Sequence, residues 1–153
     1  MANQKVIDCL NTALRIEYSA VIQYCQHSAL VAGIDRKVYE DFFEAASVEA
    51  RTHAKKVADW IVSLGGVPTI EAAHIEQATD LEEMLNQDLS TEREALQAYR
   101  DAHASTGDTD PIRFMLEEQI ILEQEDVWEI EKYLNMLKVK VTQKKIDLQA
   151  GSA

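Results

Sequence analysis

Apolar residues recur at steps of three and four along four stretches of this chain, which is the spacing of the buried face of an α-helix. The chain contains only five glycines and two prolines, so these stretches are long. The pattern predicts four helices, over about 3–31, 36–64, 81–104 and 111–138. In the second helix it predicts an inward face that begins with Val38, Phe42, Ala46 and Ala50. We therefore expect an all-α fold.

The connections between the predicted helices differ in length, and this difference predicts the topology. Gly33 makes only a short turn after the first helix, so the first two helices should be antiparallel neighbours. Gly65, Gly66 and Pro68 end the second helix, and residues 67–79 show no sustained helical pattern. We expect this segment to lie along a four-helix bundle, as a long crossover that joins two antiparallel hairpins.

The length of the chain, 153 residues, suits a single well-cored domain over 1–153. The bundle would occupy about 3–138. The weakly patterned tail, 139–153, could extend the last helix, form a short extra helix or be disordered.

Five ionisable side chains interrupt the apolar pattern, at positions where a helix of a globular protein normally buries an apolar residue. They are Glu17, His53, Glu92, Glu123 and Asp126. Burying an isolated carboxylate is costly, so such groups are normally paired, protonated or bound to metal. Oxygen ligands and a histidine that converge between helices suit iron or manganese. The pattern therefore predicts a metal site inside the bundle.

The spacing of these residues allows their side chains to meet. Glu123 and Asp126 are three residues apart and share a face of their helix. Glu49 lies four residues before His53 on a shared face, which adds a sixth candidate ligand. Each predicted helix carries a candidate near its middle, so these side chains can lie at one level of the bundle.

Each of these residues has a simpler interpretation when it is taken alone. A single buried glutamate is usually paired with an arginine or lysine, and a single buried histidine is more often a hydrogen-bonded core residue. Glu49 alone would be a solvated surface carboxylate. No basic residue occurs in the apolar stripes that carry the candidates, so metal binding accounts for the whole set better than ion pairing does.

The formal net charge of −12 argues against nucleic acid or an anionic membrane surface as a partner, and is compatible with bound cations. No apolar run approaches a membrane span, and the first residues contain no apolar signal core. Cys9 and Cys25 lie sixteen residues apart in one predicted helix, too far to bridge each other. We expect reduced thiols in a cytoplasmic protein.

Several segments of the chain resemble the bacterioferritin branch of the ferritin-like superfamily, over roughly residues 3–138. They are EYSAVIQYCQH at 17–27, HAKK at 53–56, LGGVP at 64–68 and DLSTE at 88–92. The resemblance implies a di-iron centre between the helices, with Glu17 and Glu92 as terminal ligands and Glu123 as a bridging ligand. His53 and Asp126 would complete the set. It also implies a homo-oligomer, at least a dimer, with a cage as the larger possibility.

The chain departs from the family pattern at three positions. Ala50 stands where the family carries a glutamate that bridges the two metals, and Asp126 stands where it carries a histidine. Arg51 stands where haem-binding members carry a methionine, so we expect no haem. The short fifth helix of the family is not evident in the tail.

These residues leave three functional hypotheses open. In the first, the protein oxidises ferrous iron and stores it if its subunits enclose a cage. In the second, a diverged centre holds one metal, or manganese or zinc, and acts as an oxidoreductase without storing iron. In the third, a metal-free helical module serves assembly. A DNA-protecting cage of the same superfamily fits less well, because such proteins carry a histidine in the first helix, where this chain has Glu17.

Overall fold

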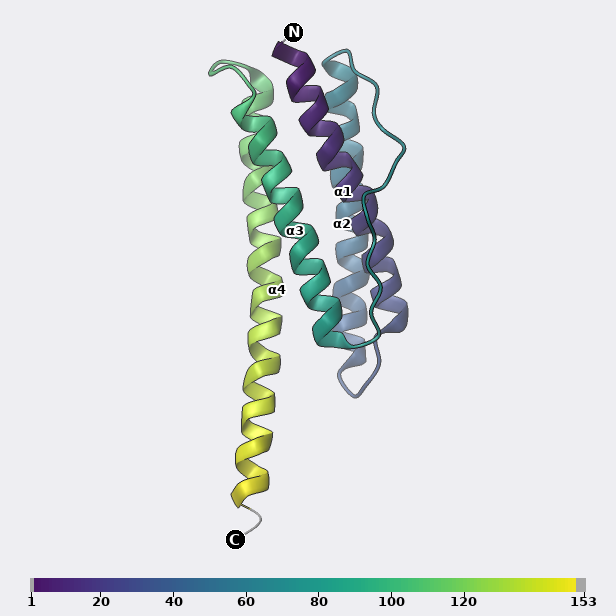
Figure 1. Cartoon of the computed structure of the whole chain (residues 1–153), viewed down its shortest axis with the longest axis vertical. Coiled ribbons are helices and arrows are strands. Elements are labelled where there is room, and N and C mark those ends of the chain that lie inside the picture. Colours follow the sequence, from purple (N-terminus) through teal and green to yellow (C-terminus); the bar gives the residue numbers. More distant parts are fainter. Residues whose placement is uncertain (1, 151–153) are drawn as a thin grey trace.

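The computed structural model of the chain is a bundle of four α-helices (Figure 1). It describes residues 2–150, with side chains from residue 4 onward. The helices are α1 (Ala2–Leu30), α2 (Arg36–Ser63), α3 (Leu81–Ala104) and α4 (Pro111–Ala150). The predicted all-α four-helix bundle is confirmed, and no strand occurs within 2–150.

The connections confirm the two hairpins and the long crossover. Gly33 makes the turn between α1 and α2 with φ of +103°, a conformation that costs glycine little. The segment between α2 and α3 runs back along the bundle beside α1 (Figure 1). The amide of Ala73 in this segment donates to the carbonyl of Arg15 on α1 at 2.8 Å. The Asp80 carboxylate then accepts from the Glu83 amide and caps α3.

Packing is tightest within the two hairpins and between α1 and α3, whereas α2 and α4 do not pack closely along their lengths. The apolar core falls into two clusters, one toward each end of the bundle. One cluster includes Leu10, Leu14, Val57, Tyr99 and Leu116, and the other includes Tyr24, Phe43, Leu85, Leu89 and Ile130. Four buried ionisable residues, one from each helix, lie where the two clusters meet.

The predicted inward face of α2 is wrong at its start. Val38 was expected inside but is 58% exposed, and Tyr39 and Phe43 fill the core instead. The predicted run reached Ala50 in three steps of four residues. Each such step turns the helix about 40° past a full circle, so the accumulated rotation carries position 38 away from the core.

The tail takes the first of its three predicted forms, because α4 continues without a break to Ala150. Figure 1 shows this part of α4 extending past the ends of the other three helices. Residues 151–153 of the tail lie outside the described part of the chain, as does residue 1, so the single domain over 1–153 stays a prediction. Between residues 2 and 150, no helix combines the length and apolar character needed to cross a bilayer.

Candidate metal centre

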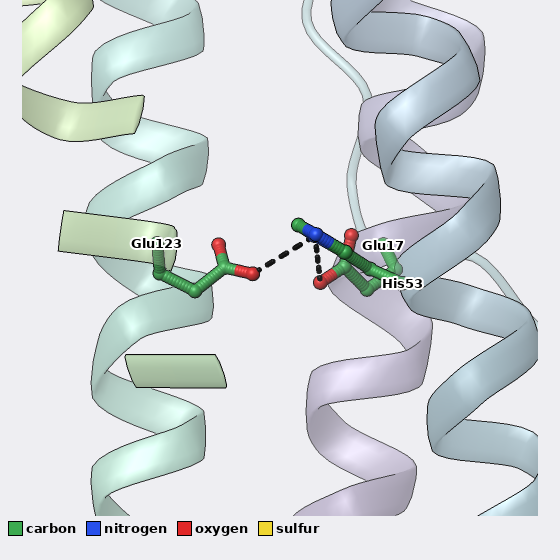
Figure 2. Close-up of side chains that lie close together, drawn as sticks. All are labelled: Glu17, His53 and Glu123. Atoms are coloured by element: carbon green, nitrogen blue, oxygen red, sulfur yellow. Dashed lines mark ion pairs between the residues drawn. The ribbon is translucent and has the colours of Figure 1, made fainter. Parts of the chain in front are cut away.

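Four buried ionisable side chains, one from each helix, lie at the junction of the two core clusters. They are Glu17 from α1, His53 from α2, Glu92 from α3 and Glu123 from α4. Asp126 lies one turn after the α4 glutamate and is partly buried. Figure 2 shows Glu17, His53 and Glu123 pointing toward one another from α1, α2 and α4. Each of the four residues lies near the middle of the part of its helix that packs in the bundle, which is why they meet at one level.

His53 is the centre of the first group of ligand atoms. Its Nδ1 atom lies 3.1 Å from Oε1 of Glu123 and 3.6 Å from Oε1 of Glu17. Burial alone would lower the pKa of His53, but hydrogen bonds and charges from these two carboxylates raise it to about 10. Burial and the charge of Glu123 raise the pKa of Glu17 from 4.5 to about 7. His53 therefore carries a proton beside the two carboxylates, and a cation that binds in this group would replace that proton.

The second group consists of carboxylates only. Glu92, Glu123 and Asp126 each offer an oxygen, and the three oxygens lie within 4.8 Å of one another. Burial raises the pKa of Glu92 well above its ordinary value, and the charges of Glu123 and Asp126 add to the rise. Burial, Glu49 and Glu123 together raise the pKa of Asp126 to about 7. Carboxylates that repel one another in a buried site favour a bound cation or protons.

Glu123 belongs to both groups, and its second oxygen fits a metal ligand. Oε1 accepts from Nε2 of Gln119 at 2.6 Å, whereas Oε2 is buried without any hydrogen-bond partner. An unpartnered buried carboxylate oxygen is costly unless a cation binds it. Oxygen-rich ligand sets with one histidine suit iron and manganese, so the residues present fit such ions.

Two tyrosines orient the outer glutamates, a role that the sequence analysis did not assign. The hydroxyl of Tyr99 donates to Oε1 of Glu17 at 2.6 Å, and the hydroxyl of Tyr24 donates to Oε1 of Glu92. Each tyrosine follows a glutamate of its own helix by seven residues. Because α1 and α3 are antiparallel, each one faces the glutamate of the other helix. This repeated Glu-x6-Tyr spacing was the available signal. Hydrogen bonds of this kind fix the orientation of metal ligands.

A cavity of about 220 Å³ leads to the centre between α2 and α4. Ala50 lines it, together with Glu17, His53, Glu92 and Asp126. Glu49, the sixth predicted candidate, also lines the cavity but belongs to neither group of ligand atoms. Its side chain is 51% exposed, and its Oε1 lies 4.0 Å from Nε2 of His53. The structure therefore brings five candidates together and leaves Glu49 at the mouth.

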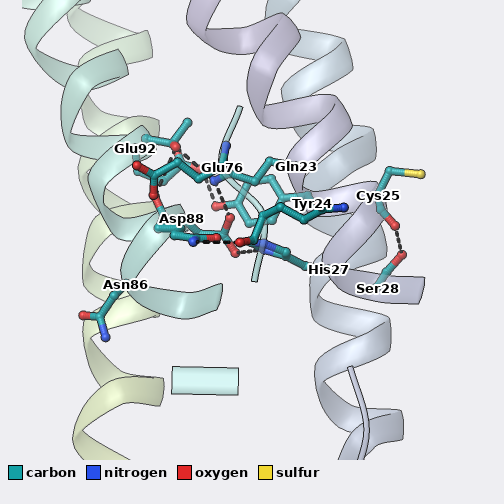
Figure 3. Close-up of polar contacts among 12 residues, drawn as sticks. Gln23, Tyr24, Cys25, His27, Ser28, Glu76, Asn86, Asp88 and Glu92 are labelled. Atoms are coloured by element: carbon teal, nitrogen blue, oxygen red, sulfur yellow. Dashed lines mark hydrogen bonds and ion pairs between the residues drawn. The ribbon is translucent and has the colours of Figure 1, made fainter. Parts of the chain in front are cut away.

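A second buried polar cluster lies one turn away and was missed by the sequence analysis (Figure 3). His27 and Asp88 are fully buried, with 2.9 Å between Nδ1 and Oδ2. Nε2 of Gln23 donates to Oδ1 of Asp88 at 2.8 Å, and Oε1 of Gln23 accepts from the Glu76 amide in the crossover. The signal was a second helical stripe on α1, at positions 16, 20, 23 and 27, all of them buried. The cluster joins α1, α3 and the crossover beside the candidate centre.

Comparison with known proteins identifies the family. Residues 7–139 match the ferritin-like domain. The chain belongs to this ferritin family. The predicted likeness to bacterioferritins is also confirmed, because the relatives include bacterial ferritins and a bacterioferritin-related protein.

Three relatives of this ferritin-like chain illustrate the likeness. Bacterial ferritin of Neisseria meningitidis is 35% identical over 101 residues, which cover 64% of each chain. The chain thus spans less than two thirds of that protein. A ferritin-like diiron-carboxylate protein of Bacillus anthracis superposes with a TM-score of 0.83 at 32% identity, covering 88% of this chain and 98% of that one. The dodecameric thioferritin of Bacteroides fragilis gives 0.82 at 28% identity, covering 92% and 90%.

Proposed function

We propose that this protein binds two ferrous ions between its helices and oxidises them. The observation that carries the proposal is that Glu123 belongs to both groups of ligand atoms. Within each group the ligand atoms lie within 4.8 Å of one another. One ion would lie with the first group and the other with the second, so that Glu123 bridges them. Membership of the ferritin-like domain family supports the proposal of iron binding.

The remaining residues take complementary roles in this proposal. Glu17 and Glu92 are terminal ligands, held in place by the hydroxyls of Tyr99 and Tyr24. His53 completes the first site and Asp126 the second. Binding requires that these groups lose their protons, because the pKa values of Glu17 and Asp126 are raised to about 7 and that of His53 to about 10.

Iron is the substrate in this reaction, and dioxygen is the oxidant. Each of two ferrous ions gives one electron, and dioxygen takes both electrons with two protons and leaves as hydrogen peroxide. The chain binds the ions side by side, keeps the centre buried apart from the α2–α4 cavity, and supplies a carboxylate-rich set that stabilises the ferric product.

Storage and assembly extend the proposal. The Bacteroides fragilis neighbour is described as dodecameric. We propose that this chain also forms a homo-oligomer, at least a dimer, and that a closed cage would allow iron storage. Arg51 is exposed on α2, and the lack of haem stays a prediction, as do the cytoplasmic location and the lack of a nucleic-acid partner.

A diverged centre is the second candidate function, and Ala50 favours it. Ala50 lines the cavity beside His53, where the resemblance implied a bridging glutamate. Asp126 replaces a histidine and adds negative charge. Such a centre would hold one ion, or manganese or zinc, and would act as an oxidoreductase without storage.

The Glu123→Ala variant tests the proposal, with Glu125→Ala on the exposed side of α4 as a matched control. We expect the first variant to lose ferrous oxidation in air and the second to retain it, because only Glu123 belongs to both groups. Unchanged oxidation by the Glu123→Ala variant would overturn the proposed bridging role.

A further inference from the structure

α4 carries two apolar faces, and only one of them packs in the bundle. The inward face includes the buried residues Ile112, Leu116, Val127, Ile130 and Leu134. Five large apolar side chains form a second line on the opposite side, and each is more than half exposed. This outer stripe consists of Phe114, Ile121, Trp128, Val139 and Ile146.

The outer stripe is a single straight line along the helix. Its members follow one another at steps of seven, seven, eleven and seven residues, all close to whole numbers of turns. It spans about 48 Å at 1.5 Å per residue. Scattered exposed apolar residues are ordinary on a protein surface, but five that share one face over about nine turns indicate a helix that binds another helix.

The last part of the outer stripe lies on the extension of α4. Nζ of Lys140 contacts Oδ2 of Asp35, at the turn between α1 and α2, at 2.7 Å. Beyond that level Figure 1 shows α4 continuing past the other helices. Residues 141–150 are exposed on every side within this chain. An isolated helical extension with apolar residues gains little stability from its own chain, so a partner helix would account for its order.

The charges of α4 are divided between its two halves. Residues 111–131 contain seven acidic residues and one arginine, whereas residues 132–150 contain five lysines and one aspartate. The two halves attract each other when two such helices lie antiparallel, and like charges meet when they lie parallel.

We propose that the outer stripe binds α4 of a second copy of this chain in antiparallel orientation. A two-fold axis at the level of residue 130 places Phe114 opposite Ile146 of the second copy, and Ile121 opposite its Val139. Trp128 then faces Lys132 of the second copy, an arrangement that permits a cation–π contact. The stripe is thus self-complementary, as a closed two-fold interface requires.

The same features argue against other partners for the outer stripe. The acidic half of α4 would repel nucleic acid and an anionic membrane surface. The apolar residues of the stripe are spaced symmetrically about residue 130, and only a second copy of the same helix requires this symmetry. The partner that matches both the charge and the spacing is the same helix, reversed.

Disulfide cross-linking of the full chain tests the orientation and the register. In a Cys25→Ser background, the variant Ile121→Cys with Val139→Cys should form a covalent dimer on oxidation. The two positions lie about 27 Å apart along one helix, so they cannot bridge within a chain. Ile121→Cys alone, and Ile121→Cys with Ile146→Cys, should stay uncrosslinked, because these positions are not opposed in the proposed register. Cross-linking of the Ile121→Cys variant on its own, or of none of the variants, would overturn the proposal.

Association of the otherwise unmodified chain gives a second test by sedimentation. Ile121→Lys puts a cation against the basic half of the second copy, and should weaken dimerisation by roughly tenfold or more. Val62→Lys on α2 is the matched control, since Val62 and Ile121 are each 60% exposed. Circular dichroism checks that both variants stay folded, which their exposure favours. Equal association of the two variants would contradict the proposal.

Discussion

Metal binding to the candidate centre should release protons from its ligands. The pKa values of those ligands determine how many protons are released at a given pH. At pH 6, Glu17 and Asp126 each hold most of a proton because their pKa values are raised to about 7. His53 holds a full proton because its pKa is about 10. Ions bound to all three groups would displace about three protons, and Glu92 adds to this number.

The pH dependence of the affinity follows with a definite sign. Each ligand must lose a proton before it binds, so the affinity should rise with pH between 6 and 7, by close to three orders of magnitude per pH unit at the lower end. Above pH 7 the slope should decrease, because Glu17 and Asp126 are then mostly ionised.

Anaerobic calorimetry with ferrous ions measures the protons directly. The titration is repeated in two buffers of different ionisation enthalpy, and the difference in heat gives the number of protons released. Asp126→Asn should release about one proton fewer at pH 6. The exposed neighbour Glu125→Gln should release nearly as many as the unmodified protein, because the Glu125 charge makes only a minor contribution to the raised pKa of Asp126. Release of less than one proton, or an affinity that is flat from pH 6 to 8, would refute the assigned ligands.

Three further predictions concern activity and stability. Ala50→Glu combined with Asp126→His should raise the rate of ferrous oxidation if the present centre is a diverged one, as stopped-flow absorbance would show; an unchanged rate would count against divergence. The metal-free protein should lose thermal stability as pH rises from about 4 to 7, since Glu17 must then ionise in the core; its rise in pKa from 4.5 to about 7 corresponds to about 3 kcal/mol. The stabilising contribution of His53 is complete below its unfolded pKa of 6.5 and is lost as pH rises toward 10, so a melting temperature that rises with pH would contradict both assignments. Gln23→Leu should cost about 1–3 kcal/mol in urea unfolding, because it leaves a buried aspartate and a crossover amide short of a partner; a cost near zero would show that water replaces the amide.

The sequence was a good guide to the fold because its local signals agree with one another. Helical periodicity, Gly33 and the Gly65-Gly66-Pro68 stop all indicate the same hairpins, so four helices and a crossover followed directly. The predicted inward face at the start of α2 was wrong because successive steps of four residues rotate around the helix axis. Only packing against the other helices decides whether Val38 or Tyr39 is buried. The continuation of α4 was one of three possibilities, since exposed residues leave no inward pattern to read.

The candidate centre was predictable where charge interrupted an apolar face. Glu17 and Glu123 stand out in their helices for this reason, and the structure brings them together. The roles of Tyr24 and Tyr99 depend on which helix each faces, which requires the antiparallel pairing of α1 and α3. The His27 cluster lies on a second face of α1, and a helix buried on two faces gives no single stripe.

An anaerobic titration of the metal-free protein with ferrous ions, followed by the admission of oxygen, tests the central claim most directly. Saturation at two ions per chain, with fast growth of near-ultraviolet absorbance once oxygen is admitted, is the result that the shared Glu123 predicts. Saturation at one ion without fast oxidation, or no binding, would contradict a di-iron centre in this chain.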